Sequence, residues 1–195
     1  MAQQTTINLK ASSLLPRKKS GKMKNLFFAL IALVSFTVFT GCNKDDDDMG
    51  DEVKNEFNYD GTTYALTKGF LNDVGGNLNG SHDWDVFLVS SGVDKNGSAL
   101  TGTGELIYLD LNTDTSTGLV AGTYNWANQR DPFTIVPGSE VFIDYNLNAF
   151  TGTKVAFTAG TADVAIDGTE TTITFTLTAD GKTLSGEWKG TLEDI

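Results

Sequence analysis

Apolar and polar residues alternate along most of the chain after about residue 54. Ile173, Phe175 and Leu177 alternate with threonines, and Val155 and Phe157 alternate with polar or small residues. A period of two places successive side chains on opposite faces of a strand, so the pattern predicts β-structure with a buried face. We expect ten strands, near residues 55–59, 62–70, 84–91, 104–111, 119–126, 140–146, 153–158, 161–167, 170–178 and 183–192. No window after residue 42 shows a helical period.

Turn sequences separate several of these segments. Asp60-Gly61, Asp167-Gly168 and Asp180-Gly181 each stand between two alternating runs, and Asn96-Gly97 is expected to turn the chain between the strands near 84–91 and 104–111. Such pairs readily adopt the positive φ of a tight hairpin turn. Short strands joined in this way predict one all-β domain, a single antiparallel β-sandwich of about ten strands. The strands near 84–91 and 104–111 are apolar on both faces, which favours the sandwich. A lipocalin-like closed β-barrel is the alternative, because the final segment SGEWKGTL would also suit a strand that closes a barrel.

The chain before this domain has the character of an export signal. Residues 26–40, LFFALIALVSFTVFT, contain twelve apolar residues and no charge, and basic residues precede them. The run is shorter than the about 20 residues of a transmembrane helix, but it suits the apolar region of a signal peptide. Because Met23 and Lys24 directly precede it, we interpret residues 23–41 as a lipoprotein signal peptide. Residues 1–22 are then a misannotated start or an extended basic region, without a fold of their own.

The chain has a single cysteine, and it follows the apolar run. Phe39-Thr40-Gly41-Cys42 resembles a bacterial lipobox, with Phe39 in place of the usual Leu. The resemblance implies cleavage before Cys42 and acylation of Cys42, which would anchor the chain to membrane lipid. Two or three acyl chains hold a protein stably at a membrane, whereas one holds it only marginally. No cysteine then remains for a disulfide.

An acidic run follows the cysteine directly. It resembles the export signal of Bacteroidota surface-exposed lipoproteins, and its residues are Lys44, Asp45, Asp46, Asp47 and Asp48. The resemblance implies an outer-membrane location with display at the cell surface. Like charges also keep a segment extended and solvated, so a spacer role is compatible with export. We expect a lipidated acidic linker over 42–54 and the β-sandwich domain over 55–195.

The acidic balance of the mature chain excludes one class of partner. After residue 41 there are eight Lys and Arg against all 25 Asp and Glu, a net charge of −17. Nucleic-acid binding needs clustered Lys and Arg to meet the phosphates. We therefore expect no nucleic acid among the partners.

Two polar runs contain metal-ligand types, but neither has a convincing ligand pattern. Residues 82–85, HDWD, offer one His and two acids, and we interpret them as a solvated loop entering a strand. Residues 110–116, DLNTDTS, begin like a calcium loop, but Thr115 stands where Gly is needed and Ala121 where Glu is needed. We interpret this run as loop residues too; whether calcium binds the 110–118 loop stays open. No metal ion or cofactor is assigned.

Aromatic residues supply the candidate binding site. Tyr124 and Trp126 share one face of a predicted strand, and Asn128 and Arg130 lie in the loop that follows. Rings beside polar groups suit sugars, which offer apolar faces and hydroxyl edges. These four residues are our candidates for ligand binding. In the alternative interpretation, Tyr124 and Trp126 belong to the core, as we also expect of Trp84 and Trp188.

The sequence carries no motif of a known catalytic class. There is no nucleophile elbow, no phosphate-binding loop and no dinucleotide fingerprint, so no catalytic residue is assigned. We expect a non-catalytic binding or adhesion module on an outer-membrane lipoprotein, with a neutral glycan or an envelope protein as partner. One alternative is a structural or accessory lipoprotein of an envelope complex. A carboxylate-based hydrolase is a further alternative, which would need carboxylates converging in a cleft.

Overall fold

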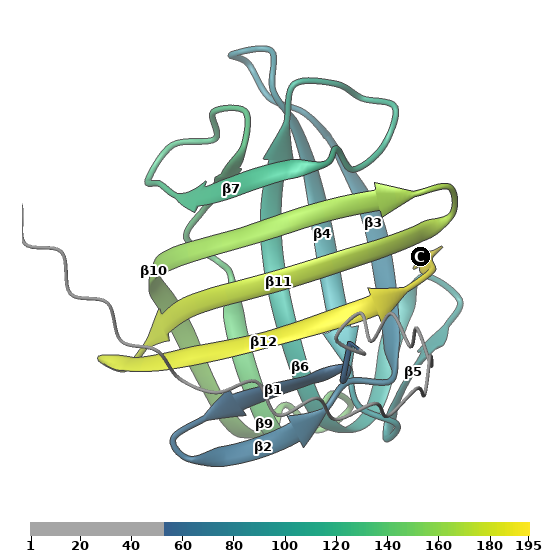
Figure 1. Cartoon of the computed structure of the whole chain (residues 1–195). Coiled ribbons are helices and arrows are strands. Elements are labelled where there is room, and N and C mark those ends of the chain that lie inside the picture. Colours follow the sequence, from purple (N-terminus) through teal and green to yellow (C-terminus); the bar gives the residue numbers. More distant parts are fainter. Residues whose placement is uncertain (1–52) are drawn as a thin grey trace, which may run out of the picture. The chain divides into compact units, whose positions relative to one another are not determined.

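The computed structural model of the chain describes residues 53–195. These residues form thirteen strands (Figure 1). In chain order they are β1 (Glu56–Tyr59), β2 (Thr62–Ala65), β3 (Lys68–Gly76), β4 (His82–Val89), β5 (Val93–Asn96), β6 (Ala99–Thr113), β7 (Gly122–Trp126), β8 (Thr134–Ile135), β9 (Glu140–Asn146), β10 (Thr151–Asp167), β11 (Glu170–Ala179), β12 (Lys182–Gly190) and β13 (Leu192–Asp194). Within this range no helix is long and apolar enough to cross a membrane. The predicted signal peptide, Cys42 and the acidic run from Lys44 to Asp48 lie outside the described residues.

The thirteen strands form one mostly antiparallel sheet. Its main path runs β13-β3-β4-β6-β8-β7-β10-β11-β12-β1-β2, while β5 pairs with β6, and β9 pairs with both β6 and β10. Among these strands, β13 pairs with β3 in parallel, and so does β7 with β8. The prediction of an all-β, antiparallel domain is confirmed at this level.

Strand boundaries differ from the prediction where the chain bends inside an alternating run. Residues 62–70 contain two strands, because the chain turns at Leu66, whose side chain enters the core and whose amide donates to the Asn55 carbonyl. Conversely, the predicted strands 153–158 and 161–167 are one strand of 17 residues, β10. β10 stays continuous past an irregularity after Phe157 and a positive φ at Gly160, and it changes partner from β9 to β11 there. Continuous pairing on at least one side therefore decides the strand count.

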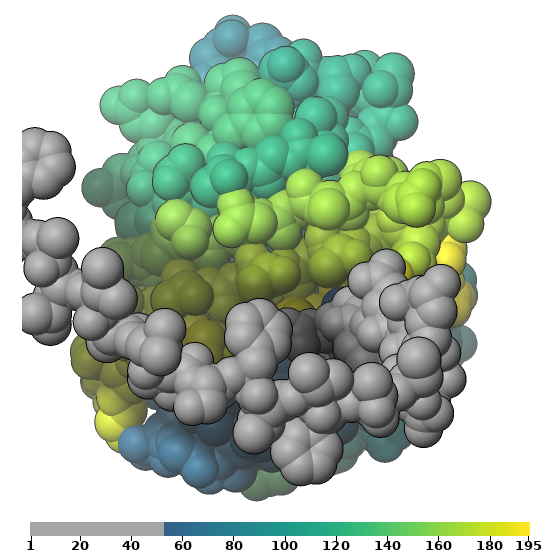
Figure 2. Space-filling view, viewed as in Figure 1, coloured from purple at the N-terminus to yellow at the C-terminus, as the bar shows by residue number. Residues whose placement is uncertain are grey.

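The main hydrophobic core lies between two layers of this sheet. β10, β11 and β12 cross in front of β3, β4 and β6 (Figure 1). Val86 and Leu109 from the rear layer belong to the same buried cluster as Phe175 and Trp188 from the front layer. Figure 2 shows, in yellow-green, the band of side chains from β10 and β11 that covers the front of this core. Burial of Trp84 and Trp188 confirms that both belong to the interior.

Five of the strands also form a partial ring. β6 pairs with β8, β8 with β7, β7 with β10, β10 with β9, and β9 again with β6. The two longest strands, β6 and β10, make this possible because each has different partners along its two halves. The connection between β7 and β8, which carries residues 127–133, is part of this ring and is held against β6.

Two of the three predicted Asp-Gly hairpin turns occur as expected, whereas the turn between β10 and β11 lies one residue later, at Gly168-Thr169, because Asp167 pairs with Glu170. Asp60 and Gly61 have φ of 53° and 78°, and Asp180 and Gly181 have φ of 50° and 69°. Both pairs thus have the two positive φ angles of a type I′ turn, which matches the twist of the flanking strands. Asn96-Gly97 also turns the chain, but it joins β5 to β6 rather than the two predicted strands.

A second, smaller hydrophobic cluster covers the opposite face of the rear layer. Phe70, Val89, Val93 and Leu106 are its buried members, and Phe87, Tyr108 and Phe142 are among the half-buried rings packed against it. Alternation explains the two clusters, because Val86 and Leu88 of β4 face the main core while Phe87 and Val89 face the smaller one. The expectation that the strands near 84–91 and 104–111 are covered on both faces is confirmed. This second face carries the candidate site.

Candidate functional site: a buried Asp–Arg cluster beside an aromatic cavity

The predicted aromatic pair does not form an exposed platform. The Tyr124 ring is fully buried in the main core, and its hydroxyl donates to the Val120 carbonyl at 2.7 Å. Burial raises the pKa of Tyr124 to about 12, and the hydrogen bond to Val120 offsets this only in part. Trp126 is half-buried and packs against the same core, so the prediction that the two rings share a face is correct. A ring without exposed surface has no face to offer a sugar, which leaves Trp126 and the exposed Asn128 as the accessible members of the pair and its loop.

Arg130, the fourth predicted site residue, binds two carboxylates from strands of the sheet. It lies in the connection between β7 and β8, and its guanidinium donates to both oxygens of Asp110, at 2.8 and 2.7 Å, and to Asp83. Asp83 lies on β4 and Asp110 on β6. A planar guanidinium suits this bidentate geometry, whereas a lysine could offer only a point charge. Arg130 is therefore bound to acids from two neighbouring strands.

The two carboxylates are buried, whereas the arginine is not fully so. Asp83 is 5% exposed and Asp110 is 3% exposed, while the Arg130 side chain keeps 39% of its surface. Burial raises the pKa of Asp110 to about 7, the Asp83 carboxyl adds to this, and the hydrogen bond to Arg130 works against it. Burial alone would lower the pKa of Arg130, but the hydrogen bond to Asp110 and the negative charges of Asp110 and Asp83 raise it by more, so the pKa is raised as well. The cluster is thus compact, and its net charge depends on one guanidinium.

Polar side chains of the β3–β4 turn hold the Arg130 loop in place. The Arg130 carbonyl accepts a hydrogen bond from the Asn79 amide at 2.8 Å and another from the Ser81 hydroxyl. The Asn79 amide also donates to the Asp131 carboxylate, and Thr134 donates to the Asp131 carbonyl at 2.6 Å. Because both the backbone and the guanidinium of Arg130 are fixed, the cluster is pre-organised.

A third carboxylate extends the cluster along the sheet. Asp85 stands directly opposite Asp110 in the β4–β6 register. It accepts a hydrogen bond from the Tyr108 hydroxyl at 2.8 Å and a longer one from the Asn72 amide at 3.4 Å. Burial raises the pKa of Asp85, although these two hydrogen bonds oppose the shift, and the pKa of Tyr108 is raised by burial and by Asp85. Asp85 is therefore linked to the cluster through Asp110 and to the apolar half of this face through Tyr108.

These positions correct two interpretations made from the sequence. The run 82–85 is not a solvated loop: it opens strand β4, and Asp83 is buried in it. The run 110–116 is not all loop either, since β6 continues to Thr113 and both Asp110 and Asn112 are buried. Strand pairing on both sides of β4 keeps these acids in the sheet, and Arg130 offsets their charge. His82 lies on the opposite face of β4 from the acids and pairs with Asp73 at 2.6 Å.

The three carboxylates also satisfy the geometric minimum for a cation site. One oxygen from each of Asp83, Asp85 and Asp110 lies within 4.8 Å of the others. The Arg130 guanidinium already occupies both oxygens of Asp110 and one of Asp83, so it takes the place that a divalent ion would need. Within the described part of the chain, the second Asp83 oxygen and the Asn112 amide nitrogen have no hydrogen-bond partner, and the two residues are direct neighbours across β4 and β6. An unpaired acceptor beside an unpaired donor suits a bridging water better than a cation.

A cavity of about 240 Å³ adjoins the cluster on the same face. Its walls are mostly apolar, and its lining is Asn72, Phe87, Ser98, Leu100, Leu106, Tyr108, Phe142, Leu147 and Ile195. The Phe87 and Tyr108 rings stack on each other with centroids 5.0 Å apart, which fixes both side chains. Asn72 and Tyr108 belong both to this wall and to the hydrogen-bonding shell of Asp85. The aromatic cavity and the Asp–Arg cluster therefore share two residues.

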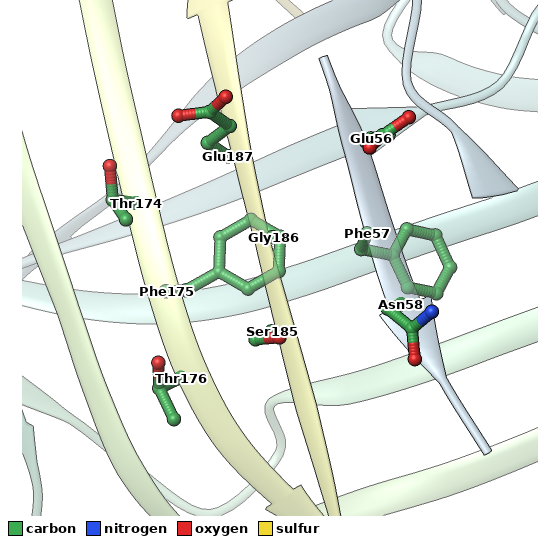
Figure 3. Close-up of a pocket in the computed structure, with 9 residues that line it drawn as sticks. All are labelled: Glu56, Phe57, Asn58, Thr174, Phe175, Thr176, Ser185, Gly186 and Glu187. Atoms are coloured by element: carbon green, nitrogen blue, oxygen red, sulfur yellow. The ribbon is translucent and has the colours of Figure 1, made fainter. Parts of the chain in front are cut away.

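A different hollow of about 340 Å³ lies over β11, β12 and β1 (Figure 3). Its outward side chains are polar and come in neighbouring pairs from the three strands: Thr174 and Thr176, Ser185 and Glu187, Asn58 and Glu56. Phe57 and Phe175 lie beneath it in the core. The hollow is open, holds no buried polar group and places Glu56 directly opposite Glu187. It has the character of a solvated sheet face, and we prefer the aromatic cavity as the candidate site.

Comparison with protein-family models, with curated proteins and with solved structures gives no match for this chain. The candidate site therefore rests on its own geometry. Of the four residues predicted from the sequence, Arg130 belongs to the Asp–Arg cluster and the other three do not. The cavity residues were not predicted. The rows Asp83-Asp85-Phe87 and Tyr108-Asp110-Asn112 share a period of two, which would have grouped the acids of the cluster with two of the nine lining residues, Phe87 and Tyr108.

Proposed function

We propose that the chain is a lipid-anchored, surface-displayed and non-catalytic binding module, and that the aromatic cavity holds its ligand. The observation that carries the proposal is the cavity itself, with rigid aromatic walls and a polar end built from Asn72 and Tyr108. Ligand sites are typically concave and mostly apolar, with a few placed polar groups. The anchoring part of the proposal rests on the lipobox resemblance at Cys42 and on the acidic run from Lys44 to Asp48.

The arrangement of the acids supports binding over hydrolysis. A carboxylate-based hydrolase needs two carboxylates on either side of the bond that breaks. Here Asp83 and Asp110 converge on Arg130, and Asp85 converges on Tyr108 and Asn72. None of the three belongs to the lining of the cavity. They act on a ligand through the residues that they orient.

The cavity favours a small, largely apolar ligand over a glycan. Its volume of about 240 Å³ is below the several hundred cubic ångströms of typical drug-sized sites. Leu100, Leu106 and Leu147 offer nothing to the hydroxyl edges of a sugar. A single aromatic ring or a short branched chain matches the walls better than a glycan does. The neutral-glycan expectation from Trp126 and Asn128 then becomes the second outcome of the binding test.

We also propose that the two layers of the sheet form a β-sandwich rather than a closed barrel. Because one core is enclosed between the layer of β10, β11 and β12 and the layer of β3, β4 and β6, we favour the predicted β-sandwich over the lipocalin-like alternative. In a lipocalin-like barrel the ligand would enter the space inside the strands. Here that space is filled by side chains such as Leu109 and Phe175, and the cavity lies on the opposite face of β4 and β6.

A matched pair of cavity variants tests the binding proposal. The probe is ethylbenzene, added to the full chain and followed by NMR shifts of methyl groups in Leu106 and Leu147. Ser98→Trp should abolish binding, because Ser98 is an exposed residue of the cavity wall and a large ring there would fill the space. Ser185→Trp, the same change in the polar hollow, should leave binding unchanged. Absence of binding of both ethylbenzene and its amine analogue 2-phenylethylamine by the wild type, or equal ethylbenzene binding by Ser98→Trp, would contradict the proposal, and retention on a neutral-glycan array would then favour the loop of Trp126.

Lipid anchoring is tested at the cysteine. Cys42→Ser should abolish incorporation of a labelled fatty acid and prevent normal processing of the precursor, because the sulfur is the acylated atom in the lipobox reaction. Wild-type labelling of the variant would refute the anchor.

Surface display is tested at the acidic run. Replacing Lys44 and Asp45 to Asp48 with Ala should leave the protein lipidated but protected from external protease on intact cells. If wild type and variant are digested equally, the run is only a spacer.

A further inference from the structure

The polar end of the cavity offers more hydrogen-bond acceptors than donors. The hydroxyl of Tyr108 has a single proton, and it donates that proton to Asp85 at 2.8 Å. The Tyr108 oxygen can then only accept a hydrogen bond from the cavity side. The Asn72 amide directs one of its two N–H groups toward Asp85, at 3.4 Å, and keeps its carbonyl oxygen as an acceptor and its second N–H as a donor. With Asp85 bonded in this way, the polar end of the cavity has two acceptor oxygens against one remaining N–H, and we call this end the acceptor surface.

The negative charge of the acids beside the cavity also favours a ligand that donates hydrogen bonds and is positively charged. Asp83, Asp85 and Asp110 lie together beside the cavity on the same face of the sheet, and Arg130 is bonded to two of them. Among residues 53–195 Asp85 has no cationic partner, and the raised pKa of its carboxyl reflects its burial and the nearby charge of Asp110. Among the residues that line the cavity, none has a charged side chain. The lysine beside the Phe142 ring, Lys154, is paired with Glu140 at 3.0 Å.

Given the proposed function, on which this step rests, we infer that the ligand of the cavity is a small apolar molecule with a primary ammonium group. Its apolar part packs between Phe87, Phe142 and Leu106, and its N–H groups donate to the Tyr108 oxygen and the Asn72 carbonyl. An ammonium group supplies donors without acceptors, which matches the acceptor surface. Its positive charge also matches the negative charge of Asp85, the carboxylate that is bonded to Tyr108 and not to Arg130. A carboxylate ligand would meet acceptors and like charge, and is disfavoured on both grounds.

Three probes with the same ring separate this inference from the proposed function. They are 2-phenylethylamine, ethylbenzene and 3-phenylpropionate, titrated into the full chain at pH 7.5. The amine should bind at least about tenfold more tightly than ethylbenzene, since a hydrogen bond to a charged group is commonly worth that factor or more. The carboxylate should bind most weakly of the three. Equal or tighter binding of 3-phenylpropionate than of the amine would overturn the inference, while ethylbenzene binding would leave the proposed function in place. If none of the three binds, both fail.

Two variants test the residues that set the preference. Tyr108→Phe removes the acceptor oxygen but keeps the ring, so amine affinity should fall by about tenfold while ethylbenzene affinity stays within about twofold. Asp85→Asn keeps the shape and the acceptor for the Tyr108 hydroxyl but removes the charge, so the amine should weaken and 3-phenylpropionate should strengthen. Ethylbenzene binding reports in each case that the cavity is intact. An equal loss of amine and ethylbenzene affinity in Tyr108→Phe, or an unchanged ranking of probes in Asp85→Asn, would refute the assigned role of the acceptor surface.

Discussion

Replacing Arg130 with methionine should reveal how strongly the buried acids depend on one cation. The change keeps much of the side-chain volume and removes the hydrogen bonds to Asp83 and to both oxygens of Asp110. Breaking a buried ion pair by removing one partner commonly costs about 3–5 kcal/mol, because the other charge stays buried. The Arg130 side chain is 39% exposed, so water can replace part of its role, and we take the lower end, about 3 kcal/mol. Domains are stable by about 5–15 kcal/mol, so this loss is easily measured by urea unfolding.

The pH dependence gives this prediction its sharper form. The Asp110 pKa in the folded chain is about 7, above its ordinary value, so between about pH 4 and 7 the folded state binds more protons than the unfolded state. Stability from this group therefore falls as pH rises through that window. Without Arg130 the pKa of Asp110 should rise further, and the fall in stability should extend above pH 7. The difference between wild type and Arg130→Met should be about 3 kcal/mol at pH 8 and should shrink toward pH 5.

The controls separate the buried cluster from surface charge. Lys182→Met breaks an exposed pair with Asp60 and should leave the urea midpoint almost unchanged at both pH values. Adding Asp83→Asn and Asp110→Asn to Arg130→Met should recover part of the lost stability, because the two buried carboxylates that Arg130 neutralised are then uncharged. A loss below about 1 kcal/mol at pH 8, or a loss that is the same at pH 5, would refute the view that Arg130 neutralises buried carboxylates.

Two further changes test the front layer and the predicted aromatic pair. Gly186→Ala should lower the free energy of unfolding by about 1–3 kcal/mol, because its Cβ would lie 2.5 Å from the Glu56 carbonyl oxygen and 2.6 Å from the Phe57 Cβ. The control is Ser185→Ala, at the neighbouring position that faces outward. An unchanged thermal midpoint for Gly186→Ala would contradict this packing. Trp126→Ala should cost about 2 kcal/mol in urea unfolding, less than a fully buried tryptophan, because the ring is half-buried against the core. A negligible stability loss together with weaker retention of a neutral glycan would instead support Trp126 as a binding residue.

Periodicity in the sequence was sufficient to predict an all-β fold, but not which strands pair with one another. Alternation in β11 and β12 predicted both strands and the burial of Phe175 and Trp188, and the Asp180-Gly181 turn between them. The strands that were missed are short or depend on distant partners. β8 has two residues, and β13 exists because Leu192 pairs in parallel with Gly69, more than a hundred residues earlier. Such pairs leave no local pattern, so the sequence could not predict them.

The Asp–Arg cluster escaped prediction because each of its parts is locally misleading. Aspartate is unfavourable in strands on average, and the runs 82–85 and 110–116 were both interpreted as loops, although the strand predicted near 104–111 already contained Asp110. What overrides this preference is the register, which sets Asp85 opposite Asp110, and an arginine from a loop 20 residues beyond Asp110. The rule that Tyr124 and Trp126 share a face was right, but alternation alone does not say which of two faces is solvated.

The placement of the cluster argues that it serves more than stability. A buried ion pair is often replaceable by apolar residues with no loss of stability, so its presence is weak evidence for a stabilising role. In this chain one guanidinium serves Asp83 and Asp110 and leaves Asp85 bonded to Tyr108 and Asn72. A purely structural cluster would place its third acid in solvent or give it a cation of its own. Instead Asp85 is half-buried and fixes the donors of two residues that line the cavity. In the ligand complex that we propose, the Tyr108 and Asn72 oxygens would contact the ammonium group, and the charge of Asp85 next to them would favour it over a neutral or anionic group.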